Sequence, residues 1–242
     1  GGATLLGHPM PAELADALGA ALAEGRPGAL ASTADGAHQL VLTGPELADR
    51  LGRLGTPEAD ELVVDAARRL LRRGATSTER ITEGGLDVLL DVWIPVPTVL
   101  VVGAGAIGDA LLAQAGLLGW AGRRATELAD ASTAMAEFTD ADVLVLLDHG
   151  PEFDALLIDG VRRGRGFLGA LGSRRTQAAR RERLTAEGLS AAELALLHGP
   201  VGLDLGARTP AETAVSIVAE VIAARSGRVA SSLAASEGRI GT

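Results

Sequence analysis

The feature that most constrains the fold is a glycine-rich turn that follows an apolar run. Val99–Val102 is fully apolar, and the turn after it has the spacing Gly-x-Gly-x-x-Gly before a helical pattern begins. In a nucleotide-binding βαβ unit, the first glycine allows the tight turn and the second lets the backbone approach a phosphate. The third lets helix and strand pack closely. The motif therefore predicts a strand, an anion-binding turn and a helix. The cofactor-binding residues it predicts are Gly103, Gly105, Ala106, Ile107 and Gly108.

Apolar strand patterns alternate with helical patterns after Pro95-Val-Pro97. The pattern predicts strands at 99–102, 142–147 and 166–169, and helices at 107–118, 152–163, 174–187 and 210–225, with a short helix after Ser190. Such alternation is typical of a Rossmann-like, doubly wound and mostly parallel sheet. Before the prolines, helices are predicted at 11–24 and 57–73, and strands at 28–33, 38–43 and 86–93. We therefore expect an α/β protein with a small N-terminal α+β domain at 1–95, a Rossmann-like domain at 96–226 and a flexible tail at 227–242.

Composition narrows the function further. The net charge of -9 and the pI of about 5.0 argue against nucleic acid as a partner, because neutralising phosphates requires basic surface. Every basic residue is arginine and cysteine is absent, so lysine Schiff bases, thiolate metal sites and cysteine nucleophiles are excluded. No apolar run is long enough to span a bilayer, and we expect a cytoplasmic protein with no metal site. The hydrophobic share of 47% favours a homodimer.

The region after the glycine motif leaves the cofactor open. An acidic residue that holds an adenosine ribose is expected roughly twenty residues after the motif begins. The stretch 118–127 has no clean apolar strand there and carries Arg123 and Arg124 instead. These arginines either accept the 2′-phosphate of NADP or lie on a solvated loop.

A second anion site is predicted where the helix at 174–187 begins. Ser173 is a good N-cap, which leaves backbone N–H groups facing outward, and Arg174 and Arg175 add positive charge. The alternative is that these arginines pair with an acid such as Glu182 and fix the loop.

A third helix start follows the same pattern. Thr209 is a capping residue before a proline, and Arg208 stands next to it. Arg208 either binds an anion or pairs with Glu212. Asp204, between two glycines, either faces the cleft or shapes the turn.

Catalytic residues are only weakly indicated. His149 and Asp148 follow the strand at 142–147, where open α/β sheets bind ligands, so Asp148 could orient His149 as a base. The alternative for His149, and for His198 further along, is hydrogen bonding within a loop.

Two long segments carry a family resemblance. The first is Gly166-Phe-Leu-Gly-Ala-Leu-Gly-Ser-Arg-Arg-Thr176, which continues through Arg181-Glu-Arg-Leu184. The second is His198-Gly-Pro-Val-Gly-Leu-Asp-Leu-Gly-Ala-Arg-Thr-Pro-Ala-Glu212. Together they resemble the XdhC/CoxI family, the accessory proteins of xanthine dehydrogenase and carbon monoxide dehydrogenase. The resemblance covers most of 96–225.

The resemblance implies a small N-terminal domain followed by a Rossmann-like domain. It also implies a chaperone that binds molybdenum cofactor (molybdopterin), protects it during sulfuration and delivers it to a client molybdenum hydroxylase. The chain departs from the family in three places. The stretch from Ala29 to Leu42 is shorter than the family pattern, and two motifs differ. The Gly-Gly-Cys element of the family appears as Leu54–Glu58, with Pro57 at the cysteine position, and its Thr-His-Asp-Pro-like element appears as Leu147–Pro151. The chain is thus a divergent member.

Two functions from different classes follow. The first is a molybdenum-cofactor insertion chaperone, which rests on the resemblance. The second is an NAD(P)-dependent oxidoreductase on the same frame, which the glycine turn and the paired arginines favour, although tyrosine and lysine are absent as proton donors. A scaffold with a vestigial ligand site is the third alternative, so whether the chain is an enzyme stays open.

Overall fold

The computed structural model describes residues 9–72, 76–83, 85–164 and 166–235. The chain divides into two compact units, with the division between Pro95 and Val96. Arg73, the last residue of a predicted helix, and 236–242 of the predicted tail lie outside the described residues. No described helix has the length and apolar character needed to cross a membrane.

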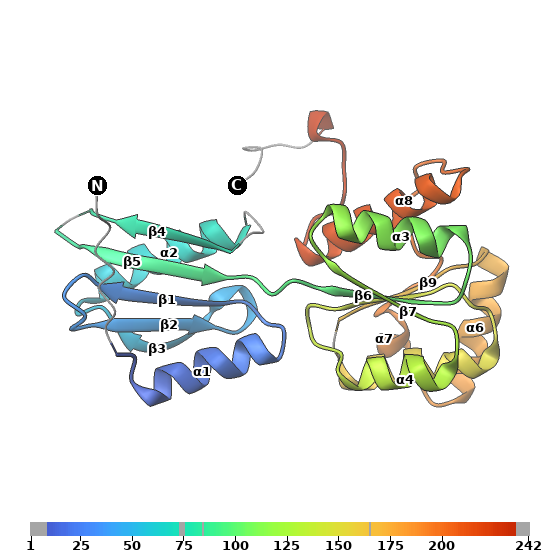
Figure 1. Cartoon of the computed structure of the whole chain (residues 1–242), viewed down its shortest axis with the longest axis horizontal. Helices are drawn as coiled ribbons and strands as arrows, with labels where there is room; N and C mark the ends of the chain where they lie inside the picture. The colour runs from blue at the N-terminus through green and yellow to red at the C-terminus, as the bar shows by residue number, and fades with distance from the viewer. Residues whose placement is uncertain (1–8, 73–75, 84, 165, 236–242) are drawn as a thin grey trace. The chain divides into compact units, whose positions relative to one another are not determined.

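The first unit is built on an antiparallel five-stranded sheet in the order β3-β2-β1-β5-β4 (Figure 1). Its strands are β1 (Gly28–Thr33), β2 (Gln39–Thr43), β3 (Asp49–Arg53), β4 (Ser77–Ile81) and β5 (Val88–Trp93). Its helices are α1 (Ala12–Ala23), the 3-10 turn η1 (Pro45–Leu47) and α2 (Pro57–Arg72). Alternate residues of the strands face α2 and α1, so that Leu40 packs with α2 and Val41 packs with α1. The predicted α+β character of this part is confirmed.

The second unit is a wholly parallel sheet in the order β10-β9-β8-β6-β7. Its strands are β6 (Thr98–Val102), β7 (Ala121–Ala125), β8 (Val143–Leu146), β9 (Phe167–Ala170) and β10 (Leu197–His198). Its helices are α3 (Ala106–Leu117), α4 (Leu128–Ala136), η2 (Pro151–Phe153), α5 (Asp154–Arg163), α6 (Arg174–Ala186), α7 (Ala191–Leu194), α8 (Pro210–Arg225) and η3 (Leu233–Ala235). The predicted Rossmann-like fold is confirmed.

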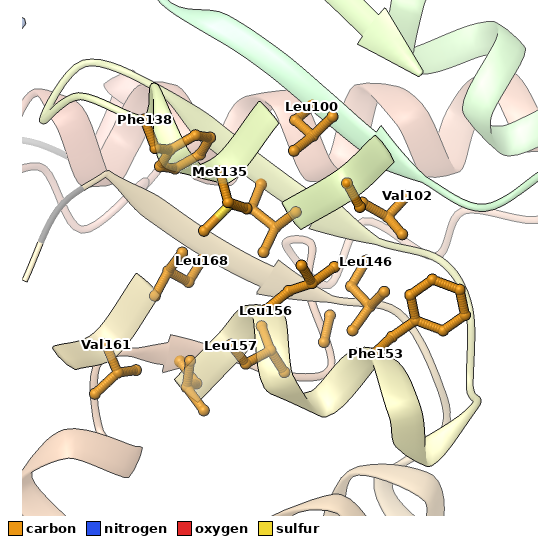
Figure 2. Close-up of a cluster of buried hydrophobic side chains, with 14 of the residues drawn as sticks. Leu100, Val102, Met135, Phe138, Leu146, Phe153, Leu156, Leu157, Val161 and Leu168 are labelled. Carbon is orange, nitrogen blue, oxygen red and sulfur yellow. The ribbon is translucent and has the colours of Figure 1, made fainter. Parts of the chain in front are cut away.

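Helices cover both faces of this sheet (Figure 1). Val99 and Val101 pack with α3 and α8 on one face. Leu100 and Val102 point to the other face, where Figure 2 shows them in a cluster with side chains from α4 and α5, including Met135 of α4. Because both faces are buried, these strands are apolar throughout and do not alternate with polar residues.

The strand order places a topological switch point next to the glycine turn. The chain goes from β6 to β7 on one side and then returns to β8 on the other side of β6. Ligands of open α/β sheets bind at such a switch point, beyond the carboxyl ends of the two strands. The loops that follow β6 and β8 are therefore the first place to look for a site.

The expectation that the region before Thr126 lacks a second strand is wrong. β7 pairs with β6 in parallel, with Arg123 opposite Leu100 and Arg124 opposite Val101. β7 is an edge strand that is largely exposed, so its formation depends on hydrogen bonds to β6 and needs no apolar run.

Candidate functional site

Gly103 is the glycine that the fold requires most strictly. It is buried with a φ of 118°, and a Cβ at this position would stand 3.2 Å from the backbone nitrogen of Asp148. Its N–H donates to the carbonyl of Ala125 at 2.9 Å, which ties the turn to the end of β7. The first glycine thus allows the loops after β6 and β8 to meet at the switch point.

Gly105 has a different surrounding. It has a φ of 111° and is the N-cap of α3, but open space lies where a Cβ would be. Ala106 begins α3 and is exposed, whereas Ile107 is half-buried against the core. The exposed Gly105 and Ala106 leave the backbone at the start of α3 open to an anion.

Gly108 makes room for the side chain of Arg124. A Cβ on Gly108 would stand 2.9 Å from Nη2 of Arg124, whose Nη1 pairs with the Asp109 carboxylate at 2.8 Å. Nη1 of Arg123 lies 3.5 Å from Oε2 of Glu137. The expectation of a loop at the two arginines is wrong, because they are successive residues of strand β7, although both side chains are partly exposed as expected. As neighbours on a strand they point to opposite faces. They are therefore not arranged to grip one phosphate together.

Glu127 is the acidic residue that sequence reasoning passed over. It is exposed and lies between the end of β7 and α4, for which it occupies the N-cap position. Its distance from the glycine motif was the available signal, but the sequence shows no apolar strand whose end would mark this position. In a dinucleotide site this is the region that holds the adenosine ribose.

The loop after β8 carries the predicted catalytic candidates. The Asp148 carboxylate accepts the N–H of Gly150 at 2.8 Å, which closes a local turn. His149 is exposed. Across the described ranges, no hydrogen bond joins Asp148 to His149, so this structure does not show the carboxylate orienting the imidazole.

The start of α6 has the local geometry of an anion site. Ser173 caps the helix, since its Oγ accepts the N–H of Thr176 at 3.1 Å. Arg174 and Arg175 are exposed, and neither forms an ion pair with Glu182 or any other described residue. The Cβ of a residue at Gly172, which has a φ of 142°, would crowd Thr176. Glycine therefore permits the close turn into the helix.

The loop before α8 is fixed by a capping box. The Glu212 carboxylate accepts the backbone N–H groups of Arg208 at 2.7 Å and Thr209 at 2.9 Å. These hydrogen bonds hold the pKa of Glu212 below its usual value. Glu212 thus binds the backbone of Arg208 and not its guanidinium, which is exposed, as is Asp204.

His198 has a structural environment. Its ring stacks on Phe167 with centroids 4.0 Å apart, and its Nδ1 lies 2.8 Å from Oε1 of Glu220. The other oxygen of Glu220 accepts the N–H of Gly202 at 2.5 Å. The pair therefore joins β10 and the following loop to α8.

Two buried polar residues of α6 were missed. Gln177 donates from Nε2 to the carbonyls of Ala170 at 3.1 Å and Leu171 at 2.9 Å, which fixes the end of β9. Arg180 is buried beside Asp154 and paired with it. The signal was the spacing of Gln177, Arg180 and Leu184, which places both polar side chains on the buried face marked by leucine.

Together these loops form an edge suited to anions. The N-termini of α3, α6 and α8 follow the carboxyl ends of β6, β9 and β10, and Arg174, Arg175 and Arg208 stand beside two of them. Exposed N–H groups and guanidinium groups bind phosphate and carboxylate. Within the part of the chain that the structure describes, no group of three or more metal-ligating side chains is found.

Comparisons with known proteins agree with this architecture. The crystal structure described as a xanthine dehydrogenase from Bacillus halodurans aligns with 91% of this chain and 65% of that chain, with a TM-score of 0.50 and 18% identity. At this identity the match shows a shared fold.

Sequence comparison identifies the family. YqeB of Escherichia coli K12, described as an uncharacterized protein, is 28% identical over 173 residues, which are 64% of this chain and 32% of YqeB. The chain thus spans about a third of that relative's length. Residues 99–221, which contain the glycine turn and all three helix starts, match the XdhC Rossmann domain family. The chain therefore belongs to the XdhC family.

Proposed function

We propose that this protein is an XdhC-type accessory protein that binds molybdenum cofactor as cargo and delivers it to a xanthine dehydrogenase-type molybdenum hydroxylase. The observation that carries the proposal is the family match over 99–221. Within that match, the glycine turn and the start of α6, which carries Arg174 and Arg175, both follow the carboxyl ends of strands of the parallel sheet.

The cargo chemistry fits this edge. Molybdopterin carries a phosphate, and in some forms a nucleotide joined through it. A phosphate at the N-terminus of α6 would meet the N–H groups of the first turn and the exposed guanidinium groups of Arg174 and Arg175. The open backbone at Gly105 would permit close approach of a second phosphate.

An NAD(P)-dependent oxidoreductase is the second candidate. The glycine turn at the β6–α3 junction fits a dinucleotide, and Glu127 follows β7 where an adenosine ribose would lie. The opposed directions of Arg123 and Arg124 favour NAD over NADP. The geometry for proton transfer has less support, because no hydrogen bond between described residues joins the Asp148 carboxylate to the His149 ring.

A homodimer belongs to the proposal as well. α3 and α8 lie side by side on one face of the sheet (Figure 1). Leu117 of α3 is 80% exposed, and Val215 and Ile222 of α8 are each 45% exposed. Apolar side chains on adjacent helices support self-association. Sedimentation of the wild-type chain and of Ile222→Glu tests this, since the variant should remain monomeric.

The test of the main proposal is calorimetric titration of molybdenum cofactor, NAD and NADP into the protein under anaerobic conditions. Arg174→Ala with Arg175→Ala is the site variant, and Arg163→Ala is the control, because Arg163 lies at the far end of α5 and pairs with Asp159. We expect selective pterin binding, weakened about tenfold or more in the site variant and unchanged in the control. Tight NAD or NADP binding without pterin binding would replace this proposal with the second candidate.

A further inference from the structure

Arg180 is the most deeply buried charged side chain among the described residues, with 1% of its surface exposed. It lies on α6, beyond the N-terminal turn that carries Arg174 and Arg175. A buried guanidinium is strongly destabilising unless it is paired and hydrogen-bonded. Its contacts therefore show what it does.

The Arg180 guanidinium joins two elements. Its Nε donates to Oδ1 of Asp154 at 2.9 Å, and its Nη2 donates to the backbone carbonyl of Asp148 at 2.9 Å. Asp154 begins α5 and is itself buried, and its other oxygen accepts from Nε of Arg183 at 2.7 Å. One carboxylate thus serves two guanidinium groups.

One nitrogen of Arg180 remains unused. Nη1 is buried and has no hydrogen-bond partner in the described part of the chain. Leaving such a donor buried and unpaired destabilises the fold. An apolar residue of similar volume would fill the same space without leaving a donor unpaired. Filling the core therefore does not by itself account for an arginine at this position.

The Asp148 carbonyl lies at the switch point of the sheet. The backbone N–H groups of Leu147 and Asp148 both donate to the carbonyl of Val102, at 2.8 and 3.3 Å, and Gly103 packs against the Asp148 nitrogen. The Asp148 N–H thus binds β6, whereas the Asp148 carbonyl accepts a hydrogen bond from Arg180. Arg180 therefore couples α6 to the loop that borders the glycine turn and carries the exposed His149.

We infer that Arg180 is a positioning residue for the loop after β8, at the switch point between β6 and β8. It holds the Asp148 carbonyl, and through it the loop at 147–150, which borders the edge where an anionic ligand would bind. That the loop serves ligand binding rests on the proposed function. The claim that Arg180 sets the conformation of the loop does not depend on the proposed function.

The experiment compares Arg180→Met and Arg180→Lys with the control Arg183→Met. The control removes the other guanidinium from the same carboxylate, and Arg183 is 39% exposed in its side chain. NMR of the full, ligand-free chain follows the Asp148 carbonyl resonance and the backbone amide signal of His149, and inorganic pyrophosphate is then titrated as the anion probe. Circular dichroism establishes that each variant is folded.

Both Arg180 variants should move the Asp148 and His149 signals, and Arg183→Met should leave them in place. Arg180→Met should weaken pyrophosphate binding at least tenfold, and Arg180→Lys should recover part of this loss because it keeps the charge. Folded Arg180 variants with unchanged loop signals, or equal effects of Arg183→Met, would overturn the inference.

Two further readouts keep the outcome decisive. If the Arg180 variants do not fold, the wild-type chain is measured instead. The guanidinium N–H signals of Arg180 are expected to exchange slowly with solvent and to shift when pyrophosphate is added. Fast exchange without a shift would contradict the inference. If neither pyrophosphate nor molybdenum cofactor binds the wild type, the proposed function fails, whereas the ligand-free loop signals still decide the role of Arg180.

Discussion

Gly103 and Asp148 are in contact across the switch point, so that a Cβ on Gly103 would stand 3.2 Å from the Asp148 backbone nitrogen. The two residues belong to loops that follow neighbouring parallel strands, β6 and β8. The close approach explains why the motif begins with glycine in this chain, independently of any ligand. It also makes the first glycine separable by experiment from the second.

Gly103→Ala should destabilise the second unit more than Gly105→Ala. Both glycines have a positive φ, which adds strain of order 1–3 kcal/mol for a side chain, but only Gly103 also lacks space for the Cβ. Denaturant unfolding measures the difference. In a Trp93→Phe background, Trp120 is the sole tryptophan and reports on this unit. Equal losses of stability would show that the contact at Asp148 is unimportant.

Asp142→Ala should cost roughly 3 kcal/mol, the expected effect of leaving buried donors unpaired. The buried Asp142 carboxylate accepts the backbone N–H groups of Thr98 and Thr139, each at 2.7 Å, and ties the start of β6 to the turn before β8. Asp142→Asn keeps one acceptor and should lose about half as much. Unfolding followed by Trp120 fluorescence checks both variants, and an Asp142→Ala protein as stable as wild type would refute this account of the turn.

Glu220 should make stability depend on pH. Burial raises its pKa, but hydrogen bonds from the His198 ring and the Gly202 N–H outweigh burial and leave the pKa below its usual value. A carboxylate with a lowered folded-state pKa stabilises the fold above its unfolded-state pKa of about 4.3, and this contribution is lost as the pH falls through the folded-state pKa.

The stability difference between wild type and Glu220→Gln should therefore be full at neutral pH and shrink in the acid range. Unfolding midpoints measured from neutral pH down to the acid range test this, with the exposed Glu182→Gln as the control. A difference that stays constant with pH would show that the ionised carboxylate does not stabilise this contact.

The strands that sequence reasoning found and those it missed have a physical explanation. β6 and β8 lie inside the sheet and are buried on both faces. The apolar runs within 99–102 and 142–147 therefore predict these two strands. The missed strands β3, β4, β7 and β10 are the four edge strands of the two sheets. Edge strands are held by hydrogen bonds on one side and tolerate charged residues such as Arg123, so hydrophobic patterning does not reveal them.

The candidate site was predictable where local chemistry determines it. The glycine turn follows from backbone geometry, and the caps at Ser173 and Thr209 follow from side-chain reach within one helical turn. The partners of Arg180 were not predictable, because Asp148 and Asp154 come from other elements and only the packed fold brings them together. Nothing in the sequence distinguishes Arg180 from the neighbouring arginines except the periodicity of Leu184.

The binding of molybdenum cofactor at the carboxyl edge of the parallel sheet is the central claim, and amide hydrogen exchange of the full chain with and without the cofactor tests it most directly. We predict protection of the four segments that form this edge, at 103–106, 148–150, 172–175 and 199–209, and little change in the first unit. Protection elsewhere in the chain, or no protection at saturating cofactor, would contradict the claim.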